Sequence, residues 1–149
     1  MSIPDSKDQK IVQLLGHDAR QDSEAIADQL GLSAATIRRR VKRLLKSGLL
    51  RVVGIVDPAD FGLPLAAVIA IDADPDKLHS IINILAKQTE IKWVSTTTGR
   101  FDIMIFARFP SSAALSDFVA EKLSGIEGIK DTETFMCLDV KKGRHTTMI

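Results

Sequence analysis

The sequence is poor in the residues that build disulfide networks, metal centres and aromatic binding sites. Its 149 residues include one cysteine, one tryptophan and no tyrosine. With a single cysteine, Cys137, neither an intrachain disulfide nor a cysteine-rich zinc site is possible. The apolar neighbours of Cys137 predict a small side chain buried in a strand, and a reducing cytoplasm suits this composition.

Long apolar runs and catalytic motifs are missing as well. No segment approaches the ~18 apolar residues of a membrane span, and the first residues lack the apolar core of a secretory signal. The three histidines, His17, His79 and His145, stand too far apart for a metal-ligand motif, and we expect each at the surface. No nucleophile elbow, phosphate-binding loop or pair of catalytic carboxylates is recognisable. We therefore expect no enzyme, no metal and no cofactor.

What the sequence does contain is one strongly basic segment. The net charge of the chain is only +1, yet residues 33–51 hold seven lysines and arginines and no acid. The same segment carries apolar residues that would lie within about 100° of one another on a helix: Ile37, Val41, Leu44 and Leu45. A helix that buries one side and presents cations on the other is suited to a polyanion. DNA is the leading candidate.

The residues before the basic helix predict two further helices and a tight turn. Asp5 is placed to cap the first helix, and Asp22 or Ser23 is placed to cap the second. Gly31 suits the left-handed conformation at the end of the second helix, and Ser33 is placed to cap the basic one. Two short helices joined by such a turn form a helix-turn-helix.

The segment after the basic helix predicts a boundary between two domains. Residues 49–56 are rich in β-formers and would either fold back as a wing or lead out as a strand. Residues 57–62 then combine a proline, a glycine and two acids between apolar runs. We expect a DNA-binding domain over 1–56, a linker over 57–62 and a second domain over 63–149.

The second domain alternates between strand and helix patterns. The expected elements are a strand at 65–71, a helix at 75–87, strands at 91–98 and 103–109, a helix at 113–123 and a strand at 132–140. This βαββαβ order is ferredoxin-like. The expected fold class is therefore α+β, with an N-terminal (winged) helix-turn-helix followed by a ferredoxin-like domain. Because two helices cover only one face of the sheet, the other face needs a partner, and we expect a homodimer.

Several short motifs occur in the order and spacing of a known family. They are Asp5-x-x-Asp8-x-x-Ile11, Asp18-Ala19-Arg20, Ala27-x-x-Leu30-Gly31-Leu32-Ser33, Ile37-x-x-Arg40-Val41-x-x-Leu44, Gly48-Leu49-Leu50, Thr98-Gly99-x-Phe101-Asp102 and Gly128-Ile129-x-x-Thr132-x-Thr134. Together they resemble the Lrp/AsnC (feast/famine) family of prokaryotic transcriptional regulators. The resemblance implies dimers that assemble into rings, commonly octamers, and amino-acid effectors held where dimers meet. One departure is Phe101, which stands where the family signature usually has a tyrosine.

The helix-turn-helix interpretation assigns roles to the side chains of the basic helix. Residues near its start meet base edges, and the flanking cations meet phosphates. The expected base-reading residues are Ala35, Thr36 and Arg39, and the expected phosphate contacts are Ser33, Arg38, Lys42, Arg43 and Lys46. Arg40 flanks the apolar stripe, so it would either contact DNA or form an ion pair with an acid of the first or second helix.

An effector site is predicted around residues 99–102, between two strands. In one interpretation this segment is an ordinary hairpin turn, in which Asp102 bonds its own backbone. In the other, Asp102 and the backbone near Gly99 meet the α-amino group of an amino acid, and Arg100 meets a carboxylate. Threonines of the neighbouring strands would then form the polar walls: Thr96, Thr98, Thr132 and Thr134.

Two other functions are compatible with parts of this sequence. A ring that wraps DNA with little sequence preference would use the same cations. Some members of the family that this chain resembles have become sirohaem decarboxylases, but such an enzyme would have no use for the cationic face of the basic helix. The expected function is that of a transcriptional regulator that binds specific sequences of double-stranded DNA.

Overall fold

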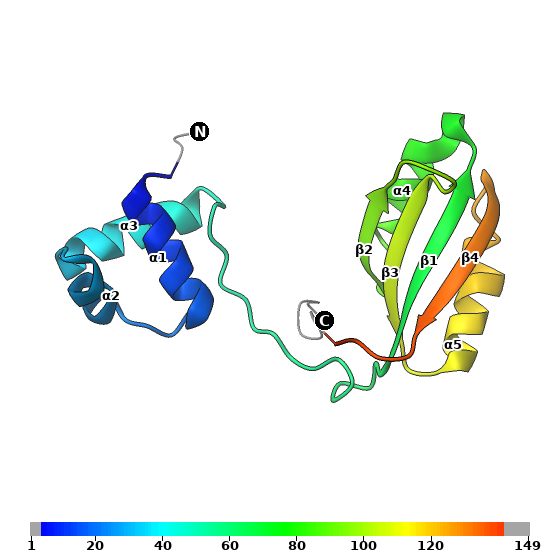
Figure 1. Cartoon of the computed structure of the whole chain (residues 1–149). Coiled ribbons are helices and arrows are strands. Elements are labelled where there is room, and N and C mark those ends of the chain that lie inside the picture. Colours follow the sequence, from blue (N-terminus) through cyan, green and yellow to red (C-terminus); the bar gives the residue numbers. More distant parts are fainter. Residues whose placement is uncertain (1–3, 142–149) are drawn as a thin grey trace. The chain divides into compact units, whose positions relative to one another are not determined.

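The computed structural model describes residues 4–141 of the chain (Figure 1). The chain divides into two compact units, Met1–Val53 and Gly54–Ile149, each with its own hydrophobic core. Within the described residues, no helix has both the length and the apolar character that crossing a membrane requires.

The first unit consists of three helices whose N-termini are capped as the sequence predicts. The helices are α1 (Ser6–His17), α2 (Ser23–Leu30) and α3 (Ala34–Lys46). The side chains of Asp5, Asp22 and Ser33 each accept a hydrogen bond from a backbone N–H in the first turn of their helix. Gly31 ends α2 with a φ of 62°, so the turn before α3 requires a residue that tolerates the left-handed region.

The core of the first unit comes from the apolar faces of its three helices. Ile11 of α1, Ile26 of α2, and Ile37 and Leu44 of α3 are buried and form one cluster. Leu45, which the sequence places on the same stripe, is exposed and does not pack in that cluster. The cluster determines which side of α3 faces inward and therefore which side faces solvent.

The predicted wing is absent from the described chain. Residues 50–57 form neither a hairpin nor a strand, and the apolar side chains of Val52, Val53 and Ile55 are exposed. β-Branched residues favour a strand only where a neighbouring strand supplies hydrogen bonds and side-chain contacts. No strand of the described residues pairs with this segment.

The second unit is an antiparallel sheet of four strands with helices on one face (Figure 1). Its elements are β1 (Leu65–Ala73), a short 3-10 helix (Pro75–Lys77), α4 (Leu78–Leu85), β2 (Ile91–Thr96), β3 (Ile103–Phe109), α5 (Ser112–Asp117) with a π-helical continuation (Phe118–Leu123), and β4 (Ile129–Cys137). The strand order is β2-β3-β1-β4. This arrangement confirms the expected ferredoxin-like topology.

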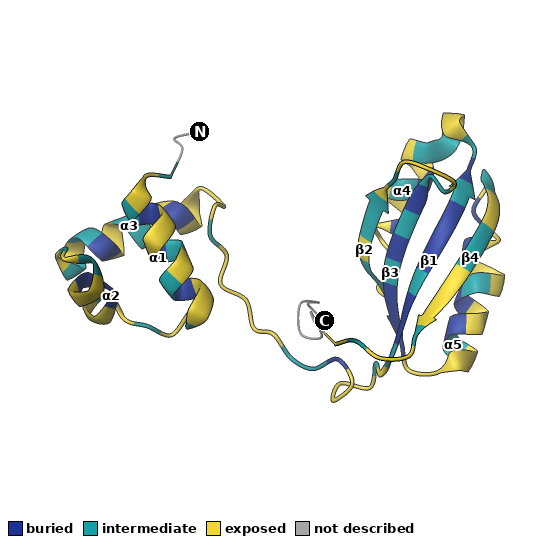
Figure 2. Ribbon diagram, in the orientation of Figure 1, coloured by how far each residue is buried: buried dark blue, intermediate teal, exposed yellow. Residues whose placement is uncertain are grey.

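Alternate residues of each strand separate a buried face from an open one. Ile69, Ile71, Ile103 and Ile105 point toward α4 and α5 and are fully buried, as the dark central strands in Figure 2 show. The opposite face carries one apolar row in register across all four strands, formed by Trp93, Phe106, Val68 and Phe135. Both outer members of this row are about half exposed, Trp93 at 48% and Phe135 at 47%.

β1 extends to Ala73, two residues beyond its expected end, and the edges of two other strands also differ from the prediction. β2 ends at Thr96, so Thr98 lies in the following turn and shares no strand face with Thr96. β4 begins at Ile129 and ends at Cys137, three residues earlier at both ends than expected. The pairing explains the second shift, because Cys137 lies opposite Ala66 at the start of β1 and Leu138 has no partner there.

Candidate DNA-binding surface and effector region

The polar residues at the start of α3 are linked by hydrogen bonds. The hydroxyl of Ser33 accepts a hydrogen bond from the backbone N–H of Thr36 at 3.2 Å, and the two hydroxyls lie 2.9 Å apart. Ser33 and Ala35 are exposed, and Thr36 is partly exposed. All three therefore stand at the helix N-terminus, where a helix-turn-helix presents its base-reading residues.

The outward face of α3 carries cations without an internal partner. Arg39, Lys42 and Lys46 are exposed, and within the described residues none of them forms an ion pair. At 100° per residue they lie within about 60° of each other and opposite the buried Ile37. This face is therefore free to meet a polyanion.

The other arginines of α3 lie on its two flanks and are paired. On one flank, Arg38 pairs with Glu24 of α2, and both side chains are more than half exposed. On the other flank, Arg40 Nη1 donates to Asp5 Oδ2 at 2.7 Å and to Asp8 Oδ1 at 2.8 Å. Arg43 Nη2 donates to the second carboxylate oxygen of Asp8. The ion pair foreseen as one alternative for Arg40 is therefore present.

Asp8 is the residue of this region to which sequence analysis gave no role. Its exposure is 1%, and both of its oxygens accept from guanidinium groups. A signal for it exists in the sequence, because Asp8 lies one turn before Ile11 and two turns before Leu15, on the buried face of α1. A carboxylate at such a position requires a cationic partner.

The pairing shifts the protonation of the groups involved. The hydrogen bond from Arg40, followed by one from the backbone N–H of Asp8, lowers the pKa of the Asp5 carboxyl below its ordinary value of 3.8. The hydrogen bonds to Asp5 and Asp8 raise the pKa of the Arg40 guanidinium. The charges of Asp5 and Arg40 are therefore present throughout the neutral range. Next to them, Arg39, Arg40 and Arg43 line a surface hollow of about 340 Å³.

In the effector region, Asp102 is bound by the backbone. Its Oδ2 accepts from the N–H of Ala73 at 2.9 Å, and its own N–H donates to the carbonyl of Ile71 at 3.0 Å. The hydroxyl of Thr97 donates to the carbonyl of Phe101 at 2.7 Å, and Gly99 has a φ of 117°. These contacts close the turn and tie it to the end of β1. Thr97, which sequence reasoning did not single out, is part of this turn.

The remaining predicted effector residues are not brought together within one chain. Thr96 lies opposite Ile103, Ile103 opposite Ile71, and Ile71 opposite Thr132. Thr96 and Thr132 are thus in one row but on the two outer strands, roughly 14 Å apart at the usual strand spacing. Thr134 lies two residues further along β4, opposite Ile69.

Arg100 is directed toward the open face of the sheet. Its guanidinium lies 4.8 Å from the centre of the Phe101 ring and 3.8 Å from a carboxylate oxygen of Glu133 on β4. Glu133 pairs in register with Ala70, next to the apolar row of that face. The cation of the turn is therefore held away from the threonines.

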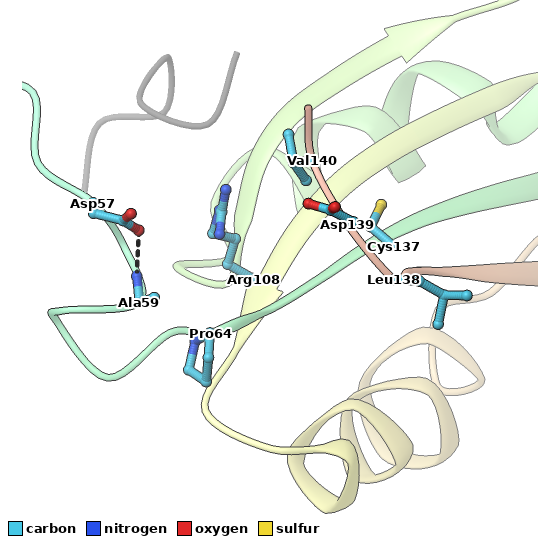
Figure 3. Close-up of a pocket in the computed structure, with 8 residues that line it drawn as sticks. All are labelled: Asp57, Ala59, Pro64, Arg108, Cys137, Leu138, Asp139 and Val140. Atoms are coloured by element: carbon cyan, nitrogen blue, oxygen red, sulfur yellow. Dashed lines mark hydrogen bonds between the residues drawn. The ribbon is translucent and has the colours of Figure 1, made fainter. Parts of the chain in front are cut away.

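A second hollow lies at the other end of the sheet (Figure 3). It has a volume of about 100 Å³ and is lined by Asp57, Ala59, Pro64, Arg108, Cys137, Leu138, Asp139 and Val140. Arg108 is 4% exposed, and its guanidinium lies 5.5 Å from the centre of the Phe106 ring. Cys137 is half-buried rather than buried, because β4 is an edge strand with an open face. Sequence reasoning did not identify Arg108, which interrupts an otherwise apolar strand.

The two histidines that the structure describes lie at the surface, as the sequence predicts. His17 and His79 are exposed, and His145 lies outside the described residues. Among residues 4–141, no group of three or more His, Cys, Asp or Glu side chains is arranged to hold a metal ion.

Proteins similar to this chain are named as transcriptional regulators. An HTH-type transcriptional regulator from Pyrococcus furiosus is 37% identical over 139 residues, which cover 93% of this chain and 94% of the relative. One from Pyrococcus horikoshii is 34% identical and covers 93% of this chain and 88% of the relative.

Solved structures of similar proteins have the same fold along nearly the whole chain. E. coli AsnC matches with a TM-score of 0.86 and 27% identity, over 94% of this chain and 95% of that protein. A transcriptional regulator from Neisseria meningitidis, solved in a complex with L-Met, matches with a TM-score of 0.86 and 25% identity, over 97% and 96% of the two chains.

Two family models match the two units in turn. The AsnC-type helix-turn-helix domain matches residues 5–45, which include all three helices of the first unit up to Leu45. The Lrp/AsnC ligand binding domain matches residues 66–146, which include the four-stranded sheet. The relatives that match along both units are named as HTH-type transcriptional regulators rather than as enzymes. The chain belongs to the Lrp/AsnC family of transcriptional regulators, with a DNA-binding helix-turn-helix at its N-terminus.

Proposed function

We propose that this regulator recognises a specific DNA sequence by placing α3 in the major groove. The observation that carries the proposal is the outward face of α3, on which Arg39, Lys42 and Lys46 are exposed and unpaired among the described residues. Ala35 and Thr36, at the start of the same helix, approach thymine methyl groups, and Arg39 donates to a guanine.

The other polar side chains of α3 contact the DNA backbone. Ser33 binds phosphate through its hydroxyl or backbone N–H at the helix start, and Lys42 and Lys46 do so through their ammonium groups. Arg38 has only an exposed ion pair to exchange, which is worth little in water. Phosphate contacts fix the register of the helix, whereas the residues at its start select the bases.

We propose that the second unit forms a homodimer through the open face of its sheet. The row of Trp93, Phe106, Val68 and Phe135 supports this, because large half-exposed side chains in one row gain most from a matching surface. A two-fold dimer presents two α3 helices about 34 Å apart, or a multiple of that distance, and requires a pseudo-palindromic site. Further assembly of dimers into an octamer is part of this proposal.

We also propose that an amino acid or a related metabolite binds where two dimers meet. The match to a ligand binding domain and the L-Met complex of a similar protein support this proposal. Because Thr96 and Thr132 lie on opposite edges of the sheet, one chain alone does not complete the site. The turn at 99–102 and Thr98 would supply one wall, and a second copy would supply the other. Effector binding and DNA binding would then be reciprocally linked.

The test is selection of bound duplexes from a random pool by the full chain, with and without each amino acid. We expect enrichment of a pseudo-palindrome whose half-sites are about 10 base pairs apart, or a multiple of that, and a change in enrichment with one effector. Enrichment of no sequence would replace this proposal with a DNA-wrapping protein of low specificity. Light scattering on the same sample gives the oligomeric state.

We also propose that the protein acts in the cytoplasm. Residues 57–62 are proposed as the linker between its two domains.

A further inference from the structure

On the flank of α3 that faces α1, two carboxylates hold the arginine side chains in place. Attraction of a basic helix to DNA does not by itself require such fixed side chains. Asp5 and Asp8 are themselves held by the helix cap: Asp5 Oδ1 accepts from the N–H groups of Lys7 and Asp8, and Asp8 Oδ2 accepts from the N–H of Asp5. Fixed carboxylates in turn fix the guanidinium groups that donate to them. Arg40 has only 20% of its side chain exposed. Arg43 keeps 56% exposed, so it has donors left for a further acceptor.

The fixed arginines surround an opening. Arg40 and Arg43 line the surface hollow described above together with Arg39, whose guanidinium has no ion pair among the described residues. The three arginines and the two aspartates carry a formal net charge of +1, to which Arg39 contributes its charge while its guanidinium meets a base. A single phosphodiester group carries one negative charge and accepts hydrogen bonds from guanidinium groups. The hollow is therefore matched to one phosphate in charge and in donors.

We propose that this hollow is a preorganised seat for one phosphate of the DNA backbone, and that Asp5 and Asp8 are its positioning residues. The proposal rests on the proposed placement of α3 in the major groove. In that placement the outward face of the helix meets base edges, and its flanks meet the backbones on either side. Arg40 and Arg43 bind without first having to be ordered, because the two carboxylates have ordered them already.

Replacing an acid in the first unit distinguishes this proposal from general electrostatics. Loss of any negative charge near a DNA-binding surface should increase affinity for DNA. The seat predicts the reverse for Asp5→Asn. Asparagine caps a helix as well as aspartate does, so α1 remains capped, but Arg40 loses a charged partner. The matched control is Asp28→Asn, because Asp28 is exposed on α2 and has no hydrogen bond or ion pair among the described residues.

The experiment measures binding of the full chain to a 30-base-pair duplex of arbitrary sequence over a series of salt concentrations. We expect Asp5→Asn to weaken binding on the order of five-fold and to reduce the salt slope by up to about 1, as loss of a phosphate contact does. Arg43→Gln should do the same. Asp28→Asn should bind at least as tightly as the unchanged chain. Helical circular dichroism shows that each variant is folded.

Two outcomes would overturn the proposal. The first is Asp5→Asn binding as tightly as Asp28→Asn, and the second is Arg43→Gln leaving the salt slope unchanged. Lys42→Gln, on the outward face, separates failure of the seat from failure of the DNA-binding assignment. If Lys42→Gln weakens binding and Arg43→Gln does not, only the seat is wrong. If neither weakens binding, α3 does not face DNA as proposed.

Discussion

The two units of this chain use ion pairs in different ways. In the first unit, Asp8 is buried and holds two arginines of another helix. In the second, Lys122 pairs with Glu90 and Lys77 with Glu127 across the surface. A buried carboxylate without its partners is costly, whereas an exposed pair exchanges its contacts for water at little cost. The buried ion pairs of Asp8 therefore determine the geometry of a site. The surface ion pairs of the second unit add little to a fold that its apolar core determines.

The largest expected effect comes from removing the buried carboxylate. We expect Asp8→Ala to lower the free energy of unfolding of the first unit by about 3 kcal/mol, because it removes a carboxylate that pairs with both Arg40 and Arg43 and leaves the mostly buried Arg40 with Asp5 alone. Glu90→Gln in the second unit should cost no more than about 1 kcal/mol. In urea unfolding, the fluorescence of Trp93, the single tryptophan and a residue of β2, reports on the second unit. Helical circular dichroism reports on both units, so a dichroism change without a fluorescence change follows the first unit. Equal losses of unfolding free energy in the two variants would contradict this contrast between buried and surface ion pairs.

The next effect concerns DNA rather than stability. We expect Arg39→Ala to relax sequence preference, with a loss of ~1–3 kcal/mol confined to the specific site. Lys42→Ala should weaken specific and scrambled duplexes about equally, because a phosphate contact carries no sequence information. Gel shifts with both duplexes measure this, and parallel losses in the two variants would contradict the division of α3 into base-reading and phosphate-binding residues.

These expectations differ in how far the sequence alone supports them. The outward face of α3 belongs to a single helix, so the period of 3.6 residues is enough to gather Arg39, Lys42 and Lys46. The role of Asp8 depends on how α1 packs against α3, 32 residues away in sequence from Arg40. Local periodicity places Asp8 on the buried face of α1 but does not show which residues it meets there. The capping residues were predictable because a cap is a local interaction.

The effector region shows the same limit more strongly. Alternation along a strand predicts that Thr132 and Thr134 share a face, which the register confirms. The position of Thr96 relative to them depends on the strand order, which placed two strands in between. The absence of a wing from the described residues was not predictable either, since β-formers such as Val52 and Val53 make a strand only where a neighbouring strand is available.

A third prediction separates the two interpretations of Asp102. Asp102→Ala removes the acceptor for the N–H of Ala73 and should destabilise the second unit by about 1–2 kcal/mol. Asp102→Asn keeps an acceptor oxygen and removes the charge, so it should retain most of that stability. Calorimetry with the twenty amino acids then decides the role of the charge. Loss of the binding heat in the stable Asp102→Asn variant would assign the carboxylate to an effector, and an unchanged heat would leave it as a turn residue.

The smallest expected effect is the response of the two kinds of ion pair to acid. The pKa of Asp5 is lowered in the folded chain by its hydrogen bond from Arg40, and that of Glu127 is lowered by its hydrogen bond from Lys77. A carboxyl whose folded pKa is depressed adds stability above its ordinary pKa, and this stability is lost as the pH falls through the folded value. The ordinary values are 3.8 for Asp5 and 4.5 for Glu127, so both losses fall in the acid range.

In Asp5→Asn and in Glu127→Gln, the melting temperature of the altered unit should fall less steeply as the pH is lowered through this range. We call this smaller dependence of the melting temperature on pH a flattening. We expect the larger flattening for Asp5, because its partner Arg40 is itself held by the buried Asp8 and does not turn away into solvent. A larger flattening in the second unit, followed by Trp93 fluorescence, would show that the buried network gives Asp5 no advantage over an isolated surface pair.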